Sequence, residues 1–186
     1  MPVQIGASAH PFSDPAGLLS DCHRRIEMFL GALEAVAKTI NSPLTEETRR
    51  SLESALRYFR EAAPKHTADE EDSLFPRLRQ TKHADAQSAL AKLDELEKDH
   101  RWATSLHAEV ELLGQRCLRQ GSLSPNDAEN FSSAVANLGR MYRQHISVED
   151  DLIFPVASRL LSQADQASIA EEMAARRGLG LVTKIL

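Results

Sequence analysis

The sequence has few of the features that mark disulfide-rich or membrane-spanning proteins. It contains two cysteines in 186 residues, Cys22 and Cys117, and neither belongs to a CxxC pair. This argues against a disulfide scaffold or a zinc ribbon, so we expect two packed, reduced thiols. The apolar runs are only a few residues long, well short of the roughly 20 residues that a membrane helix requires. We therefore expect no membrane partner.

An excess of basic charge is also missing. The chain has 22 Lys and Arg against 27 Asp and Glu, which gives a formal net charge of −5. Because nucleic-acid binding depends on cationic contacts with phosphate, we expect no nucleic-acid partner. The doublets Arg24-Arg25 and Arg176-Arg177 are expected to be solvated helix surface. The first residues lack the basic and apolar regions of a secretory signal, which predicts a cytoplasmic location.

Signals for β-strands are scarce. Aromatic residues make up 5% of the chain, alternating Val/Ile/Thr runs are missing, and no Asn-Gly or Asp-Gly turn occurs. Apolar residues recur at helical spacing instead, which predicts an all-α protein. We expect an antiparallel, up-down four-helix bundle over residues 13–160, preceded by a tail over residues 1–12. Residues 161–186 are expected to form a short extra C-terminal helix and a mobile tail.

Capping residues and prolines predict where the helices begin and end. Helix starts are expected at Asp14-Pro15, at Thr45, near Asp85 and at Ser124-Pro125. Within the second helix, Pro64 removes a backbone donor and predicts a kink or a short break just before His66. The fourth helix is expected to loosen at Pro155. The C-terminal helix should span about residues 163–176 and end at Arg177-Gly178.

One sequence motif occurs twice in the chain. Residues 66–76 (HTADEEDSLFP) return as residues 145–155 (HISVEDDLIFP). Each copy has a histidine, a glutamate four positions later, a pair of further acidic residues and an apolar-Phe-Pro ending. A single HxxxE pattern often arises by chance, but two copies with the same following offsets are a much stronger signal. His23 and His100 precede the two copies by 43 and 45 residues, so the chain reads as one helical hairpin used twice.

The spacing within each copy predicts a metal site. Residues four apart on a helix lie about 40° apart around the axis and about 6 Å apart along it, so the histidine and glutamate point the same way. Both pairs fall on apolar helix faces, where an unpaired carboxylate is costly to bury. A cation between the helices would offset this cost. Mixed imidazole and carboxylate ligands suit iron, with manganese or zinc as possible substitutes.

These residues resemble the hemerythrin-like, HHE cation-binding family. The resemblance rests on the segments LLSDCHRRIEMFL, HTADEEDSLFPRL, LEKDHRWA and YRQHISVEDDLIFP, which cover roughly residues 12–160. It implies a four-helix bundle with a non-haem diiron centre, in a variant written H, HxxxE, H, HxxxE. Carried over position by position, the resemblance implies terminal imidazoles and bridging carboxylates at His23, His66, His100 and His145, and at Glu70 and Glu149.

The chain departs from the pattern of the oxygen-carrying hemerythrins. Those proteins have HxxxH on the third helix, whereas the residue four positions after His100 is Thr104. On the fourth helix the acid is Glu149, with Asp150 as a spare candidate. One histidine fewer leaves more open metal positions, which favours turnover or sensing over reversible oxygen carriage.

Several other residues are candidates to complete the coordination. Glu27 lies four positions after His23, and His107 lies seven positions after His100. Each is also explained by a salt bridge or by packing, and the same holds for Tyr58 and Tyr142. The flanking acids are expected either to be solvated or to hold imidazole N–H groups. They are Asp69, Glu71, Asp150 and Asp151.

Two function classes remain open on the sequence. The first is a diiron protein that binds or reacts with O2, peroxide or nitric oxide, for redox protection or sensing. The second is a non-catalytic module that stores or binds iron or another divalent metal. A purely structural bundle without bound metal is a third hypothesis. A ferritin-like site is disfavoured, because such a site needs ExxH on two helices. The sequence does not predict the oligomeric state.

Overall fold

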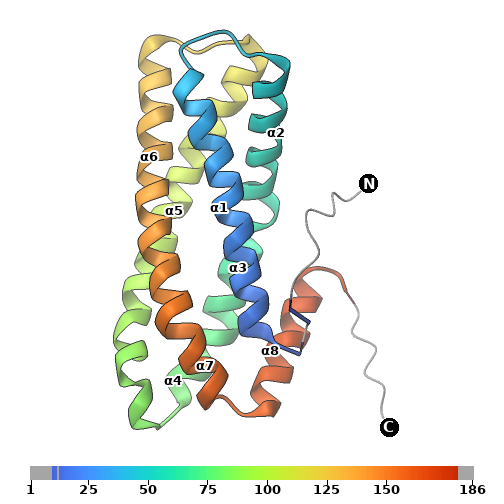
Figure 1. The fold of residues 1–186 in the computed structure, drawn as a ribbon, viewed down its shortest axis with the longest axis vertical. Coiled ribbons are helices and arrows are strands. Elements are labelled where there is room, and N and C mark those ends of the chain that lie inside the picture. Colours follow the sequence, from blue (N-terminus) through green and yellow to red (C-terminus); the bar gives the residue numbers. More distant parts are fainter. Residues whose placement is uncertain (1–9, 12, 180–186) are drawn as a thin grey trace.

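The computed structural model describes residues 10, 11 and 13–179 of the chain, which fold into a bundle of helices (Figure 1). Within these residues all regular elements are helical, which confirms the all-α prediction. The expected N-terminal tail, except for two residues, and the expected mobile C-terminal tail lie outside the described part. None of the described helices is both long and apolar enough to pass through a membrane.

The first rod of the bundle, α1 (Pro15–Thr39), begins at the predicted cap. The Asp14 Oδ1 accepts a hydrogen bond from the Gly17 N–H at 3.0 Å, which satisfies one of the free donors at the helix start. A loop then reverses the chain. Thr45 caps α2 (Glu46–Glu61) in the same way, because its hydroxyl accepts from the Thr48 N–H at 3.1 Å.

The second rod is divided into several segments. After α2, the chain breaks at Ala62 and continues as α3 (Ala63–Ala68), which has Pro64 in its first turn. This confirms the predicted interruption before His66, since an α-helix tolerates proline without a kink or break only in its first turn. A π-helical turn, η1 (Asp69–Leu74), and a short helix, α4 (Phe75–Gln80), complete the rod.

The second half of the chain repeats this layout. A 3₁₀ turn, η2 (Ala84–Ala86), leads into α5 (Gln87–Gln120), which ends at Gly121 in the left-handed conformation with φ of 80°. The Ser124 hydroxyl accepts a hydrogen bond from the Asp127 N–H at 3.2 Å. This cap starts the fourth rod, whose segments are α6 (Pro125–Val148), a second π-helical turn, η3 (Glu149–Ile153), and α7 (Phe154–Leu160).

The two π-helical turns have a common cause. Pro76 and Pro155 lack an N–H and would clash with the carbonyl four residues earlier in a regular α-helix. The backbone widens by one residue instead, so that the Phe75 N–H bonds to the Glu70 carbonyl and the Phe154 N–H bonds to the Glu149 carbonyl. The expectation of a four-helix bundle is therefore met in part, because the second and fourth rods are each divided into several helical segments.

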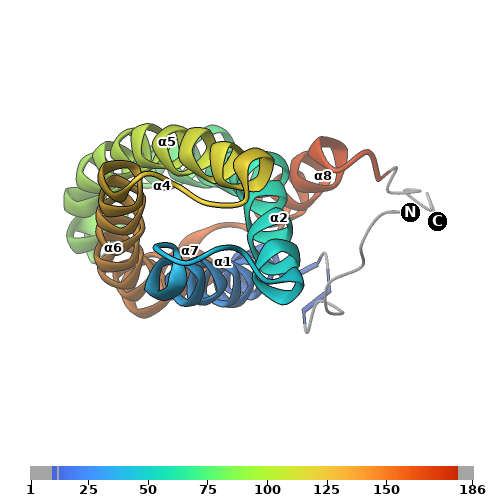
Figure 2. The same cartoon turned by 90° about the horizontal axis from the view of Figure 1, so that it is seen from above.

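The C-terminal helix, α8 (Gln163–Arg176), has the predicted bounds and lies beside α1 and η1, outside the main rods (Figures 1 and 2). The Ser162 hydroxyl caps it by accepting from the Asp165 N–H at 3.1 Å. Gly178, with φ of 69°, ends the helix as expected.

The apolar core is split into two clusters. One cluster fills the half of the bundle near the α1–α2 and α5–α6 loops, and the other lies among α4, α7 and α8. On α1, Leu19 belongs to one cluster and Ile26 to the other; on α5, Leu96 and Ala103 are divided in the same way. A buried polar layer separates the two clusters at this level.

Candidate metal centre

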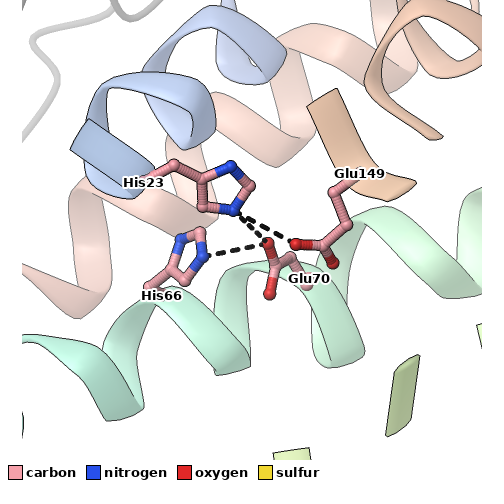
Figure 3. Close-up of side chains that lie close together, drawn as sticks. All are labelled: His23, His66, Glu70 and Glu149. Carbon is pink, nitrogen blue, oxygen red and sulfur yellow. Dashed lines mark ion pairs between the residues drawn. The ribbon is translucent and has the colours of Figure 1, made fainter. Parts of the chain in front are cut away.

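The buried polar layer brings all six predicted ligand residues together. Each rod contributes, because His23 lies on α1, His100 on α5, and the two HxxxE pairs span the α3–η1 and α6–η3 junctions. The most exposed of the six, His100, has only 7% of its surface accessible. Figure 3 shows four of them facing one another across the bundle. The six are His23, His66, Glu70, His100, His145 and Glu149.

One group of donor atoms gathers around His23 and His66. The His66 Nε2 lies 3.1 Å from the Glu70 Oε1, within one HxxxE pair. The His23 Nε2 lies 3.1 Å from the Glu149 Oε2 and 3.8 Å from the Glu70 Oε1. These four residues place one ligand atom each within 4.8 Å of one another, close enough to bind a single ion.

A second group shares the same two glutamates. The His100 Nε2 lies 3.3 Å from the Glu70 Oε2, and the His145 Nε2 lies 3.1 Å from the Glu149 Oε2. The two imidazole nitrogens are 3.0 Å apart. Glu70 therefore faces His66 and His23 with Oε1 and His100 with Oε2, whereas Glu149 faces His23 and His145 with the same oxygen, Oε2. Both glutamates belong to both groups of donor atoms.

The donor atoms themselves fit a cation. All four carboxylate oxygens of Glu70 and Glu149, the His23 Nε2 and the His66 Nδ1 are buried and make no well-oriented hydrogen bond, although imidazole nitrogens lie beside three of the oxygens. Burying such oxygens unsatisfied is costly, and a metal ion would supply the missing partner. Four imidazoles and two carboxylates form a donor set that suits iron, manganese or zinc.

Acidic residues hold the outer nitrogens of two imidazoles, His23 and His100, and in both cases the acid comes from the other half of the repeat. The His23 Nδ1 donates to the Asp150 Oδ1 at 2.9 Å, and the His100 Nδ1 donates to the Glu71 Oε1 at 2.8 Å. Both acids lie five positions after the histidine of an HxxxE pair. The prediction that flanking acids hold imidazole N–H groups is confirmed for these two.

The Phe-Pro ending of each copy also supports a histidine of the cluster. The Phe154 ring stacks on His23 with centroids 5.2 Å apart, and the Phe75 ring stacks on His100 with centroids 6.3 Å apart. Both rings are buried. Each copy of the repeated stretch thus provides two site residues and then supports, with an acid and a ring, a histidine of the opposite half.

The two remaining imidazoles, His145 and His66, have neighbours that the sequence did not predict. The His145 Nδ1 donates to the Asp99 Oδ2 at 3.3 Å. Cys22 lies close enough to His66 to be influenced by its charge, but the His66 Nδ1 has no hydrogen-bond partner among the described residues. Both Cys22 and Asp99 directly precede a site histidine. Burial raises the pKa of the Cys22 thiol, but His66 and Arg25 outweigh burial and lower it to about 7. In the sequence, Cys22 and Asp99 are marked only by their place directly before a site histidine. That place does not by itself predict a contact with a different histidine of the cluster.

Charge interactions within the cluster are strong. Burial lowers the pKa of His100, but the carboxylates, Glu70 first, raise it by more, to about 9. Burial also opposes the charge on His23, whose pKa is held well above its usual value by Asp150, Glu149 and Glu70. Burial alone would raise the pKa of Glu70, yet the neighbouring imidazoles hold it well below the usual value. The metal-free site is therefore a set of paired charges, and ion binding must displace protons from imidazole.

The prediction for Asp69 was wrong. It was expected to be solvated or to hold an imidazole, but it is completely buried and ion-paired with two arginines of the C-terminal segment. The Arg176 Nη1 lies 2.9 Å from its Oδ1, and the Arg177 Nη2 lies 2.6 Å from its Oδ2. The expectation that this arginine doublet is solvated surface is wrong, because α8 packs directly on η1. Asp151, in contrast, is exposed and accepts a hydrogen bond from the Ser147 hydroxyl.

The additional ligand candidates lie outside the two groups of donor atoms. Glu27 is on the surface in an ion pair with Arg24. The His107 Nε2 accepts a hydrogen bond from the Tyr142 hydroxyl at 2.8 Å. The Tyr58 hydroxyl lies 3.5 Å from the backbone carbonyl of Cys22. Cys22 and Cys117 are both buried free thiols, as expected.

Comparison with known proteins agrees with this geometry. An uncharacterised protein of Haemophilus influenzae (strain Rd) is 27% identical over 167 residues, which cover 89% of this chain and 91% of the relative. The hemerythrin HHE cation binding domain matches residues 14–157, a range that contains all six residues of the cluster. The chain therefore belongs to the hemerythrin HHE cation-binding domain family.

Proposed function

We propose that this protein holds two iron ions in the buried cluster and binds or reacts with O2, peroxide or nitric oxide, in redox protection or sensing. The observation that supports this most directly is the sharing of Glu70 and Glu149 between two histidine pairs. Two carboxylates placed between two imidazole pairs suit two ions rather than one. Iron is the metal that the family resemblance favours, with zinc or manganese as substitutes.

The proposal divides the six residues into two roles. Glu70 and Glu149 would be shared between the two ions, while His23 with His66 and His100 with His145 would each supply nitrogen ligands to one ion. A pair of ferrous ions supplies two electrons and an open coordination position to a small oxidant. Each ion would receive two imidazoles and shared carboxylate oxygens, which leaves room for a ligand in an octahedral shell.

The surrounding residues prepare the imidazoles for this task. Because Glu71, Asp150 and Asp99 accept from the Nδ1 atoms, the corresponding Nε2 atoms are the nitrogens left to bind an ion once they lose their protons. The stacked rings of Phe75 and Phe154 limit rotation of His100 and His23 and exclude water from that side. The protein's own contribution is thus orientation and a dry cavity.

Burial restricts which molecules can reach the cluster. Each of the six residues is at most 7% exposed, so a bulky substrate cannot reach them from solvent. A diatomic molecule or peroxide needs only a small opening of the bundle. This favours small oxidants or nitric oxide over organic substrates.

Stopped-flow mixing of the diferrous protein with O2, peroxide and nitric oxide tests the proposal. Rapid oxidation or nitrosyl formation that recurs after each re-reduction is expected. Slow, one-way oxidation would instead support the storage or passive binding alternative. Glu149→Gln should abolish the fast reaction. Glu27→Gln is a matched control, because Glu27 also lies four positions after a histidine but is paired with Arg24 at the surface.

A further inference from the structure

A buried tyrosine and a histidine form a hydrogen-bonded pair one to two helical turns from the histidines of the cluster. The Tyr142 hydroxyl donates to the His107 Nε2 at 2.8 Å. Tyr142 lies one turn before His145 on α6, and His107 lies two turns after His100 on α5. The pair therefore joins the same two helices that supply one histidine pair of the proposed centre.

The protonation states of the pair are set by burial. Burial lowers the pKa of His107 to about 4, so its imidazole is neutral at neutral pH and can accept a proton. Burial raises the pKa of the Tyr142 phenol above its usual value, and the charges of Tyr58, Glu70 and Glu149 add to this effect. Tyr142 thus keeps its proton and points it at a free base. The influence of Glu70 and Glu149 also places the phenol within electrostatic reach of the cluster.

The imidazole side of the pair faces outward. Tyr142 is only 8% exposed, whereas His107 lines a pocket of about 180 Å³ at the bundle surface together with Phe59, Arg60 and Glu111. The Phe59 ring stacks on His107, with centroids 4.5 Å apart, and fixes the imidazole plane. The pair therefore connects the buried layer of the bundle to a place where a small reductant can approach.

We propose that Tyr142 is an internal one-electron donor to the metal site, with His107 as the acceptor of its proton. This rests on the proposed function, because an oxidant must react at the cluster. When Tyr142 loses an electron, its O–H bond breaks and an N–H bond forms on the His107 Nε2. The products are a neutral phenoxyl radical and an imidazolium. A neutral base already in hydrogen-bond contact removes the need to form a charged phenol radical.

The electron count is complete with peroxide as the oxidant. Peroxide takes two electrons and two protons to become two molecules of water. When the cluster supplies only one electron, Tyr142 supplies the second, and the two protons come from solvent. A soluble one-electron reductant of the ascorbate class then restores the phenol, which recovers its proton from His107. The device would direct a surplus oxidising equivalent away from the histidine ligands.

The chain provides its own control, because it has only two tyrosines. Tyr58 is half-buried, and its hydroxyl lies near the backbone carbonyl of Cys22, which is no proton acceptor of comparable strength. Any tyrosyl radical must therefore belong to Tyr142 or Tyr58. Replacing either tyrosine by Phe removes only the hydroxyl oxygen, so the two single variants show which tyrosine carries the radical.

The first experiment uses iron-loaded protein that has been partly oxidised, mixed with peroxide and freeze-quenched for EPR. A tyrosyl signal is expected in the parent protein and in Tyr58→Phe, and its loss is expected in Tyr142→Phe. Side-chain-deuterated tyrosine should narrow the signal. Iron oxidation is followed by absorbance in the same samples. Normal iron oxidation without a radical, or with a radical that survives Tyr142→Phe, overturns the inference while leaving the proposed function intact.

A second experiment needs no metal and covers the case in which peroxide does not oxidise the centre. Metal-free protein carrying Trp102→Phe, which removes the single tryptophan, is oxidised by a photogenerated ruthenium tris(bipyridine) complex. Radical formation at Tyr142 is expected, with a rate that falls by about 100-fold in His107→Gln, the scale of one positioned base. Circular dichroism checks that the variants fold. A radical on Tyr58 alone, or a rate indifferent to His107→Gln, contradicts the proposal.

Discussion

Asp150 accepts a hydrogen bond from the His23 Nδ1 at 2.9 Å, although 127 positions separate the two residues along the chain. Glu71 and His100 repeat this relationship at 2.8 Å. Each half of the chain therefore orients an imidazole of the other half. The metal-binding residues and their supports are interlocked, so neither half is expected to form a complete site alone.

Removing one of these acids should weaken metal binding without unfolding the bundle. Glu71 is partly exposed, so Glu71→Ala leaves no large cavity, but His100 loses the acceptor that fixes its tautomer. We expect a loss of about 10- to 100-fold in affinity for ferrous or zinc ions, measured by competition with a chelator. Asp151→Asn is the control, because Asp151 is exposed and contacts Ser147. Equal affinities in the two variants would contradict the assigned role.

Metal affinity should rise with pH over the range in which the imidazoles lose protons. The pKa of His100 in the metal-free protein is raised from 6.5 to about 9, so an ion must displace a proton at neutral pH. We expect the apparent affinity to increase between pH 6.5 and 9 and protons to be released on binding. A pH-independent affinity, measured by calorimetry in buffers of different ionisation enthalpy, would contradict this.

The stability of the metal-free protein should change in the opposite direction. A folded-state pKa above the unfolded value stabilises the fold below the unfolded pKa, and this contribution disappears as pH rises through the folded pKa. For His100 the loss falls between pH 6.5 and about 9. Urea midpoints of chelator-treated protein should therefore decrease over this interval. Midpoints that rise would show that other groups dominate.

The C-terminal helix should stabilise the bundle through Asp69. Replacing both Arg176 and Arg177 by Ala leaves a completely buried carboxylate without its partners. We expect a loss of about 3 kcal/mol in the free energy of unfolding, the lower end for a broken buried pair, because the arginines are partly exposed. Urea denaturation measures this. Arg60→Ala, which breaks an exposed pair with Glu111, should cost less than about 1 kcal/mol.

Local signals in the sequence were sufficient for most helix ends. Asp14, Thr45 and Ser124 each hold a backbone N–H three residues later, and that geometry depends only on neighbours in the chain. The HxxxE pairs are predictable for the same reason, since residues four apart share a helix face. Pro64 also acted locally and interrupts the second rod where expected.

Relationships between rods were not predictable from the same signals. Asp69 lies in an acidic run, which predicts a surface position. It is buried and paired with Arg176 because α8 packs on η1. Asp99 and Cys22 precede site histidines, but their contacts depend on the rotation of each helix against its neighbours. The π-helical turns shift that rotation by one residue after Glu70 and Glu149, which a regular 3.6-residue repeat does not anticipate.

The sharing of Glu70 and Glu149 by two ions can be tested by anaerobic titration of the chelator-stripped protein with ferrous ions, read by calorimetry and by Mössbauer spectroscopy after oxidation. We expect two ions per chain, magnetic coupling between them, and impaired binding of both in Glu70→Gln. A single ion, two uncoupled ions, or a Glu70→Gln variant that still binds two with unchanged affinity would show that the glutamates are not shared.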